Sequence, residues 1–379
     1  MKIRILIEFF ALITVILLIL AFMYEQLPRS VSRSHPHNFK KNIVKEAMWY
    51  EKLPDKKVRC KLCFRRCEIS EGKRGVCGVR ENRGGKLHTL VYGQPCAVHI
   101  DPIEKEPVYH FYPGTDILCI ATAGCSFRCK FCQNWHISQA LPEDVSKYSL
   151  TPEDVVELAK REKCVGISHT YTEPTVFYEY MLDIAKLAKE EGIKNIMHTC
   201  GAMNPEPLRE LLKYMDAVTV DLKGFTKKFY RTAIPNGSLD NVLEVSKTVQ
   251  EEGVWLEIVN LVIPTFNDNP DDIRRMCKWI YKNLGDDVPL HFSRFFPAHR
   301  MKNLPPTPFE TMELAHKIAR ESGLKYVTVG NVPGHKFNST FCSKCGKVVI
   351  KRIHFAVLEH NIEDGRCKFC GEKINGIWE

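Results

Sequence analysis

Gly124-Cys125-Ser126-Phe127-Arg128-Cys129-Lys130-Phe131-Cys132-Gln133-Asn134-Trp135 is a cysteine-rich stretch that directly follows the apolar run Ile117 to Ala121. Its three thiols, Cys125, Cys129 and Cys132, have the spacing C-x3-C-x2-C. Three thiolates can hold three irons of a [4Fe-4S] cube and leave the fourth iron open to a substrate or cofactor. A structural zinc ion normally takes four closed ligands, and this loop supplies only three. The spacing therefore predicts an iron-sulfur cluster after a strand.

The same spacing, with Phe131 before the last cysteine, resembles the signature of the radical SAM superfamily. The resemblance implies that the open iron binds the amino and carboxylate groups of S-adenosylmethionine, with Phe131 beside the cofactor. It further implies reductive cleavage to methionine and a 5′-deoxyadenosyl radical, which abstracts hydrogen from a substrate. We accordingly expect a low-potential electron donor of the ferredoxin or flavodoxin type as a partner. The cofactors carry this chemistry, and the protein binds them, orients them and excludes water and oxygen.

Length and composition predict one large folded domain with appendages. The chain has 379 residues, of which 44% are hydrophobic and 26% are charged. Its net charge of +9 is spread along the sequence without a dense arginine tract, so no nucleic-acid partner is expected. Eleven of the sixteen cysteines fall into three clusters with metal-ligand spacing. The other five are expected to act as small buried hydrophobic residues: Cys96, Cys119, Cys164, Cys200 and Cys277.

The N-terminus predicts a membrane anchor. Ile5 to Met23 is almost entirely apolar, and about 20 such residues match the thickness of a bilayer. A secretory signal peptide is the alternative, but no small-x-small cleavage site follows the apolar run. Basic residues are more numerous after the run than before it, which favours a cytoplasmic body. We therefore expect an anchor helix over residues 1–27, a linker over 28–44, and a membrane-anchored enzyme whose catalytic body is cytoplasmic.

A first cysteine cluster lies within residues 45–114, an N-terminal cysteine-rich segment. Its members can bind zinc or an auxiliary iron-sulfur cluster: Cys60, Cys63, Cys67 and Cys77. A structural metal knuckle is the favoured interpretation, because nothing nearby in the sequence indicates a path for electrons. The following segment, residues 101–114, is expected to form a lid or plug. Glu104, Lys105 and His110 are candidates for a functional role there, but solvated loop residues are the favoured interpretation.

Residues 115–335 alternate strand and helix patterns, which predicts a parallel sheet. The expected strands are residues 117–122, 166–170, 195–199, 217–222, 255–263 and 290–295, with a further edge strand near 326–329. Six units are too few for a closed eight-fold barrel, so we expect an open, partial (β/α)6 TIM-like barrel with its site at the carboxyl ends of the strands. This architecture is also what the radical SAM resemblance implies. Four capping residues before proline mark helix starts: Thr151, Asn204, Asn269 and Thr307.

Two motifs at strand ends carry further resemblances. Thr170-Tyr171-Thr172-Glu173-Pro174 resembles the Gly-Gly-Glu-Pro motif that binds the amino group of S-adenosylmethionine, with both glycines replaced. Asp221-Leu222-Lys223 resembles the Asp-x-Lys of enzymes that activate glycyl radical enzymes, such as pyruvate formate-lyase activase. The resemblances imply that Glu173, Asp221 and Lys223 bind the cofactor. His198, Asn260 and His299 are weaker candidates, and no catalytic base is expected.

The C-terminal residues 336–379 contain two C-x2-C pairs. Their spacing strongly resembles a zinc ribbon, with an auxiliary iron-sulfur cluster as the alternative: Cys342, Cys345, Cys367 and Cys370. Zinc would supply folding energy that so short a segment lacks. We therefore expect a zinc-ribbon-like module at this end of the chain.

The combined motifs resemble the AmmeMemoRadiSam system radical SAM enzymes, which are related to pyruvate formate-lyase activase. The resemblance rests on the four-cysteine cluster, the cluster loop, the C-terminal cysteine pairs, Asp101-Pro-Ile-Glu-Lys105 and Tyr171-Thr-Glu-Pro174. It implies association with AMMECR and Memo family proteins. The leading hypothesis is a radical enzyme that acts on a protein or a lipid. A SAM-dependent radical methyltransferase and a membrane-tethered metal-binding scaffold remain as alternatives.

Overall fold

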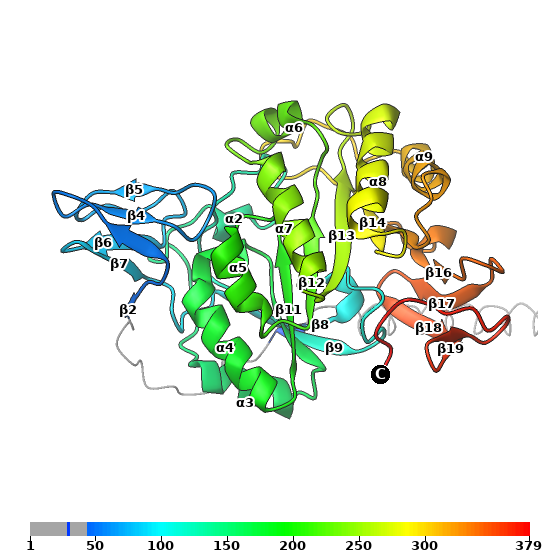
Figure 1. Cartoon of the computed structure of the whole chain (residues 1–379), viewed down its shortest axis with the longest axis horizontal. Helices are drawn as coiled ribbons and strands as arrows, with labels where there is room; N and C mark the ends of the chain where they lie inside the picture. The colour runs from blue at the N-terminus through cyan, green and yellow to red at the C-terminus, as the bar shows by residue number, and fades with distance from the viewer. Residues whose placement is uncertain (1–28, 31–43) are drawn as a thin grey trace, which may run out of the picture.

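The computed structural model describes residues 29–30 and 44–379. At its centre is a nine-stranded sheet with the order β1-β8-β9-β10-β11-β12-β13-β14-β15 (Figure 1). The strands of this sheet are β1 (Arg29–Ser30), β8 (Ala97–Pro102), β9 (Asp116–Ala121), β10 (Gly166–His169), β11 (Lys194–Thr199), β12 (Ala217–Asp221), β13 (Trp255–Val262), β14 (Leu290–Arg294) and β15 (Val327–Gly330).

Strands β9 to β15 are parallel and follow one another in chain order, as the alternating pattern predicts. The intervening helices are α3 (Pro152–Arg161), α4 (Tyr178–Glu190) with η2 (Pro174–Phe177) before it, α5 (Pro205–Leu212), α6 (Lys227–Thr232), α7 (Leu239–Glu251), α8 (Pro270–Leu284) and α9 (Phe309–Glu321). Figure 1 shows α3, α4, α5, α7 and α8 side by side over one face of the sheet. The expected edge strand is β15, so the six predicted strands and the edge strand are all present.

Alternation along the strands divides the side chains between two faces. On β9, Leu118 and Ile120 belong to the large apolar core under the helices, whereas Ile117 and Cys119 belong to a smaller cluster on the other face. A plug, residues 101–114 with η1 (Ile103–Lys105), fills that second face. The backbone N–H groups of Tyr109 and His110 donate to Glu257 on β13 at 2.8 and 2.9 Å. The plug begins beside β9 and its backbone contacts β13. The sheet must therefore curve around the plug.

The helix boundaries follow the predicted caps with one exception. Thr151 and Asp154 form a capping box at α3, and the Asn269 side chain accepts from two N–H groups of α8. The predicted cap Thr307 is wrong by one residue, because α9 begins at Phe309 and Pro308 is the residue before it. The hydroxyl of Thr307 instead donates to the carbonyl of Val262 at 2.6 Å, which joins two loops at the carboxyl end of the sheet.

A cysteine knuckle, residues 45–94, lies at one end of the molecule (Figure 1). It consists of two three-stranded sheets, made of β2 (Lys45–Glu46), β7 (Lys86–Thr89) and β6 (Arg80–Arg83), and of β3 (Tyr50–Lys52), β4 (Val58–Cys60) and β5 (Glu68–Ile69). Arg80 of the knuckle forms a buried ion pair of 2.6 Å with Glu179 of α4. This pair fixes the knuckle to the central sheet and its helices.

A C-terminal ribbon, residues 340–378, lies at the opposite end (Figure 1). After η3 (Lys336–Asn338) it contains β16 (Thr340–Phe341), β17 (Val348–Ile353), β18 (Ala356–His360), β19 (Ile362–Glu363) and β20 (Arg366–Cys367). Arg352 of the ribbon pairs with Glu104 of the plug, and both side chains are fully buried. The expectation that Glu104 and His110 are solvated is therefore wrong, because the ribbon covers the plug.

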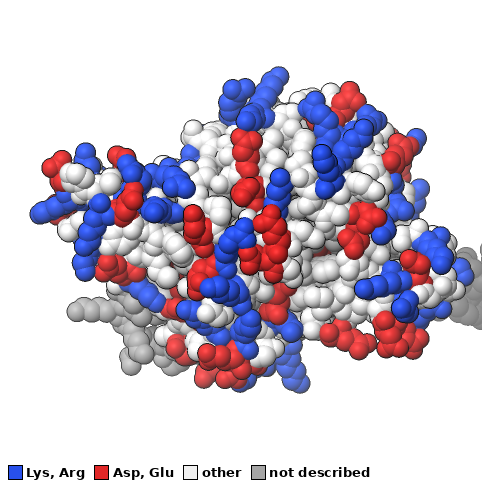
Figure 2. All heavy atoms as spheres, viewed as in Figure 1, with Lys and Arg blue, Asp and Glu red and all other residues white. Residues whose placement is uncertain are grey.

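The expected membrane-anchored localisation is contradicted. Within the described residues, no helix is both long and apolar enough to cross a bilayer. The expected span, Ile5 to Met23, lies outside the described residues. Figure 2 shows that basic and acidic side chains are interspersed over the visible face rather than gathered into one basic patch.

Candidate functional site

The three cysteines of the central motif lie in a cluster loop, residues 124–132, at the carboxyl end of β9. Gly124 turns the chain out of the strand with a φ of +87°, and a Cβ at this position would lie 2.5 Å from Val79. Only glycine fits such a close approach in this conformation. The helical turn α2 (Trp135–Ser138) follows, and its Ser138 hydroxyl lies 3.4 Å from the sulfur of Cys132.

The loop is suited to hold an iron-sulfur cluster. The sulfur of Cys125 accepts a hydrogen bond from the N–H of Phe127 at 3.4 Å, as thiolate ligands of such clusters commonly do. Burial raises the pKa of Cys125 to about 12, so the thiol ionises only when a cation such as a metal compensates the charge. Cys125, Cys129 and Cys132 interact electrostatically with one another, but among the described residues they form no group with all sulfurs within 4.8 Å. The loop cysteines are therefore less compact than the four sulfurs that one tetrahedral ion binds.

Glu173 lies beside the cluster loop at the end of β10, and its carboxylate accepts hydrogen bonds from three neighbouring residues. It accepts from the hydroxyl groups of Thr175 at 2.6 Å and Thr199 at 2.7 Å, and from the N–H of Cys200 at 2.8 Å. The side chain is buried. Glu173 therefore joins the ends of β10 and β11, and its backbone N–H donates to the thiol of Cys125.

Tyr171 adopts the backbone conformation that the resembling motif reserves for glycine. Its φ is +58°, which costs a non-glycine residue on the order of 1 kcal/mol. Two contacts hold it there: its hydroxyl donates to Asp101, and its carbonyl accepts from the side chain of Asn134 at 3.0 Å. Asn134 follows the last cluster cysteine, so the two motifs are joined directly. A non-glycine residue thus takes a left-handed conformation at this position.

Asp221 and Lys223 are brought together with His198 at the ends of β11 and β12. The Lys223 ammonium lies 2.7 Å from Asp221, and His198 Nε2 lies 3.2 Å from the same carboxylate oxygen. Burial alone would raise the pKa of Asp221, but Lys223 and His198 outweigh it and hold this pKa well below its usual range. Lys223 also interacts electrostatically with Cys129. The arrangement places a fixed cation and a fixed anion beside the cluster loop.

Glu106 of the plug extends this set of charges and was missed by the sequence analysis. Its carboxylate lies 3.6 Å from His198 Nδ1. Burial alone would lower the pKa of His198, but Asp221 and Glu106 raise it to about 10. The imidazole is therefore cationic, and charges alternate through Glu106, His198, Asp221 and Lys223.

Two further residues of the site were not predicted. Cys200, expected to be a structural residue, donates its thiol to Asp221 at 3.6 Å. Tyr230 on α6 is buried, and its hydroxyl has no hydrogen-bond partner among the described residues. Tyr230 interacts electrostatically with Cys200, Lys223 and Cys129, so the unpartnered hydroxyl belongs to the same site. A buried cysteine or tyrosine has no sequence signal that separates it from core.

The remaining candidates occupy different places. The Phe131 ring lies 5.7 Å from the Lys223 ammonium, which puts it within the site. The Asn260 side chain donates to the carbonyl of Leu222 at 2.7 Å and lies 3.5 Å from the sulfur of Met276 on α8. His299 stacks on Trp135, with ring centroids 5.4 Å apart, at the rim of the cluster loop.

The C-terminal cysteines form a compact group at the far end of the molecule. Cys342 and Cys370 sulfurs are 3.6 Å apart, Cys345 and Cys367 sulfurs 3.8 Å apart, and all four lie within 4.8 Å of one another. A tetrahedral zinc site with bonds of about 2.3 Å has sulfurs about 3.8 Å apart. Hydrogen bonding from the backbone of Lys347 lowers the pKa of Cys345 to about 7, which favours a thiolate ligand. This group could bind a metal ion.

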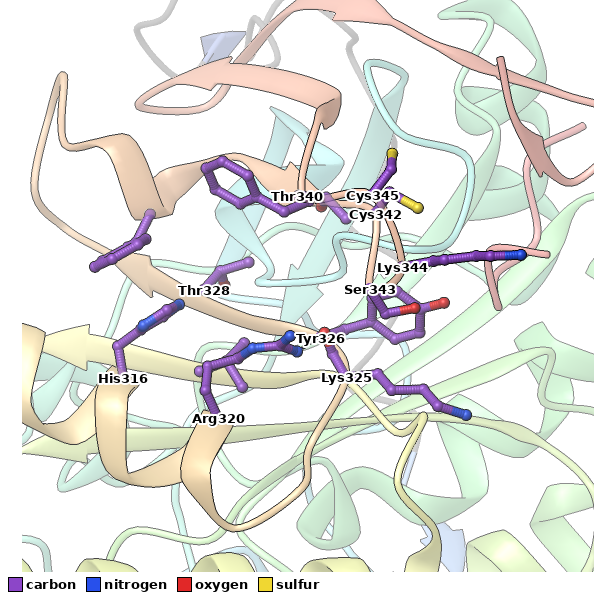
Figure 3. Close-up of a pocket in the computed structure, with 14 residues that line it drawn as sticks. His316, Arg320, Lys325, Tyr326, Thr328, Thr340, Cys342, Ser343, Lys344 and Cys345 are labelled. Atoms are coloured by element: carbon purple, nitrogen blue, oxygen red, sulfur yellow. Dashed lines mark hydrogen bonds between the residues drawn. The ribbon is translucent and has the colours of Figure 1, made fainter. Parts of the chain in front are cut away.

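A cavity of about 440 Å³ separates the ribbon from α9 and β15. Figure 3 shows His316, Arg320 and Tyr326 on one side of it, with Cys342 and Cys345 on the other. The charged residues Glu106, Asp221 and Lys223 do not line it. The cavity is therefore separate from the site at the cluster loop.

Comparison with known proteins identifies relatives of the central region. A family model described as the radical SAM superfamily matches residues 119–280. An uncharacterized protein of Methanocaldococcus jannaschii is 47% identical over 88% of this chain and 99% of its own length. The pyruvate formate-lyase-activating enzyme of Clostridium pasteurianum is 28% identical over 42% of this chain and 67% of its own length. Among solved structures, a radical SAM methyltransferase from Sphaerobacter thermophilus is 17% identical over 69% of this chain and 76% of its own, with a TM-score of 0.49.

Proposed function

This chain belongs to the radical SAM superfamily and is homologous to pyruvate formate-lyase activating enzymes, and from this membership we propose that it is a radical enzyme acting on a protein. A [4Fe-4S] cluster, when bound, would cleave S-adenosylmethionine reductively and supply a 5′-deoxyadenosyl radical for hydrogen abstraction. The proposal of a protein substrate rests on relatives named as activating enzymes, including that of 4-hydroxyphenylacetate decarboxylase from Clostridium scatologenes.

One observation carries the proposal. The three cluster-loop cysteines converge with the Lys223 ammonium and the Asp221 carboxylate, which meet at 2.7 Å, at the carboxyl ends of the parallel strands. In this arrangement Cys125, Cys129 and Cys132 would hold iron. Lys223 would bind the carboxylate of S-adenosylmethionine, because charge-assisted hydrogen bonds are strong in a partly buried site. The backbone between Tyr171 and Glu173 would bind its amino group.

Outside the site we propose zinc for the C-terminal ribbon, because the spacing of its four sulfurs matches one tetrahedral ion. We also propose that the chain is a member of the AmmeMemoRadiSam group, with AMMECR and Memo family proteins as partners. The motifs quoted from both termini support this narrower placement. A ferredoxin or flavodoxin would supply electrons at low potential.

The experiment measures products of S-adenosylmethionine by mass spectrometry after anaerobic reconstitution and chemical reduction. We expect 5′-deoxyadenosine from the native chain and at least a hundredfold less from Cys125→Ala, Cys129→Ala or Cys132→Ala, since each removes an iron ligand. Cys96→Ala, outside the three clusters, is the matched control and should keep its activity. Formation of S-adenosylhomocysteine instead would indicate methyl transfer, and unchanged product in the three variants would contradict the assignment.

A further inference from the structure

The cysteine knuckle packs directly on the cluster loop. The Arg65 guanidinium donates two hydrogen bonds to the carbonyl of Ser126, at 2.7 and 3.0 Å. In return, Arg128 of the cluster loop donates to the carbonyl of Val76 at 2.6 Å. These reciprocal contacts make the knuckle and the cluster loop one packed unit.

The contact reaches the ligands themselves. A Cβ atom on Gly124 would lie 2.6 Å from the carbonyl oxygen of Cys77, so the residue before Cys125 is packed against a knuckle cysteine. The rings of Phe64 and Phe127 also meet, with centroids 5.6 Å apart. The backbone of Gly124, directly before Cys125, thus packs against the backbone of Cys77.

The knuckle sulfurs are arranged unlike those of the ribbon. All four ribbon sulfurs lie within 4.8 Å of one another, whereas across residues 44–379 neither the knuckle nor the cluster-loop cysteines form so compact a group. A single zinc ion draws its sulfurs to about 3.8 Å, while a [4Fe-4S] cube binds each sulfur to a different iron. In the separation of its cysteine sulfurs, the knuckle therefore resembles the cluster loop and not the ribbon.

The four knuckle cysteines line one cavity together with Arg80 and Ser126. Arg80 is 2% exposed, and its Nη2 donates to Glu179 at 2.6 Å. Its Nε and Nη1 find no hydrogen-bond partner among the described residues. Unpartnered guanidinium N–H groups are costly to bury, so an anionic group that accepts hydrogen bonds beside them would be favourable. Arg80 interacts electrostatically with Cys60 and Cys77, and the thiolates and sulfides of an iron-sulfur cluster held there would supply such acceptors.

We propose that Cys60, Cys63, Cys67 and Cys77 hold a second [4Fe-4S] cluster, which relays electrons to the cluster loop. A reduced ferredoxin or flavodoxin would donate one electron to the knuckle cluster. That cluster would return to its oxidised state by reducing the cluster-loop site with the same electron, and no atom or proton is transferred. The relay rests on the proposed function, whereas the metal assignment of the knuckle does not. The proposal takes up the auxiliary iron-sulfur cluster, which the sequence left as the alternative to a structural metal knuckle.

The test measures iron, sulfide and zinc in the anaerobically reconstituted chain and in the triple variant Cys125→Ala, Cys129→Ala, Cys132→Ala, which leaves the knuckle intact. We expect about eight irons per native chain and about four in the triple variant, with about one zinc in both. If the knuckle binds zinc, the native chain holds about four irons and two zincs and the triple variant holds none of the iron. That result would overturn the proposal whether or not S-adenosylmethionine is cleaved.

The native chain provides a second measurement that does not depend on a variant. Two reduced clusters so close together broaden each other's electron paramagnetic resonance signals. We expect a broadened spectrum from the reduced native chain and a narrow signal from the reduced triple variant. A native spectrum without broadening, with both clusters present and reduced, would overturn the relay and leave only the metal assignment.

Discussion

The cysteine knuckle and the C-terminal ribbon each contain four cysteines, yet they differ in spacing and in surroundings. In the ribbon, two C-x2-C turns end at Gly346 and Gly371, with φ of +71° and +74°, and bring the sulfurs within 4.8 Å. In the knuckle the four cysteines are spaced by two, three and nine residues, and the cavity that they line is also lined by Ser126 of the cluster loop. Under the two proposed metal assignments, identical ligand types would bind different metals, because loop geometry sets the distances between sulfurs.

The knuckle and the ribbon are attached to the central sheet by the same type of contact, a buried arginine–glutamate ion pair. Each contributes a buried arginine to a glutamate of the central unit: Arg80 to Glu179, and Arg352 to Glu104. The two ion pairs therefore do not explain why the sulfur spacings of the modules differ. The modules differ in the surface that each covers: the knuckle covers the cluster loop, and the ribbon covers the plug.

The largest expected effect is loss of the ribbon fold on loss of its metal. Cys370→Ser should remove the proposed zinc and unfold residues 340–378, because a structural zinc ion contributes on the order of 10 kcal/mol at neutral pH. Zinc analysis and limited proteolysis measure the two consequences. The iron content should be unchanged, since the ribbon lies far from the cluster loop.

Cys96→Ser is the matched control, because Cys96 lies outside the three cysteine clusters. It should retain zinc and resist proteolysis like the native chain. A Cys370→Ser protein with full zinc and an intact ribbon would contradict the site, and a loss of iron would contradict the separation of the two modules.

The next largest effect concerns the two buried arginine pairs. Glu179→Gln should destabilise the chain by about 3 to 5 kcal/mol in urea unfolding, because it leaves the Arg80 charge buried and uncompensated. Glu104→Gln should cost less, since its contact with Arg352 is 3.4 Å long and burial raises the pKa of Glu104 to about 6. We therefore expect the Arg80–Glu179 pair of the knuckle to contribute more to the free energy of unfolding than the Arg352–Glu104 pair of the ribbon.

Lys351→Ala supplies the control for these variants. Its partner Glu359 lies in the same ribbon, and the two side chains are 49% and 50% exposed. Exposed pairs of this kind contribute less than about 1 kcal/mol. If Lys351→Ala and Glu179→Gln lose equal amounts of unfolding free energy, burial of the ion pair does not determine its contribution to stability.

The sequence predicted the fold well because local signals and periodicity agree along the core. Glycines two residues beyond α4, α7 and α9 take positive φ, as their positions predict: Gly192, Gly253 and Gly323. Asp221 and Lys223 were found because they follow a strand that is recognisable by its apolar run. These features depend on neighbours in the chain.

Features that depend on distant contacts were not predictable. Glu106 precedes β9, but its partner His198 ends β11, so only the curved sheet brings them together. The left-handed Tyr171 is held by Asp101 and Asn134, which no local pattern could indicate. The same limit explains the interpretation of the knuckle. Its packing against the cluster loop, through Arg65 and Arg128, joins segments far apart in sequence and was not visible there.

The smallest expected effect is a pH dependence of the free energy of unfolding, caused by His110 at the contact between the plug and the ribbon. This buried side chain lies 2.8 Å from the carbonyl of Asn375 and 3.3 Å from the hydroxyl of Thr340, and burial lowers its pKa to about 4. In the unfolded chain its pKa is about 6.5, so between pH 6.5 and 4 the unfolded state binds more protons. Stability should therefore fall by up to about 3 kcal/mol as the pH is lowered through this range. Urea unfolding of His110→Gln should show a correspondingly shallower slope, and parallel curves for the two proteins would exclude His110 as the cause.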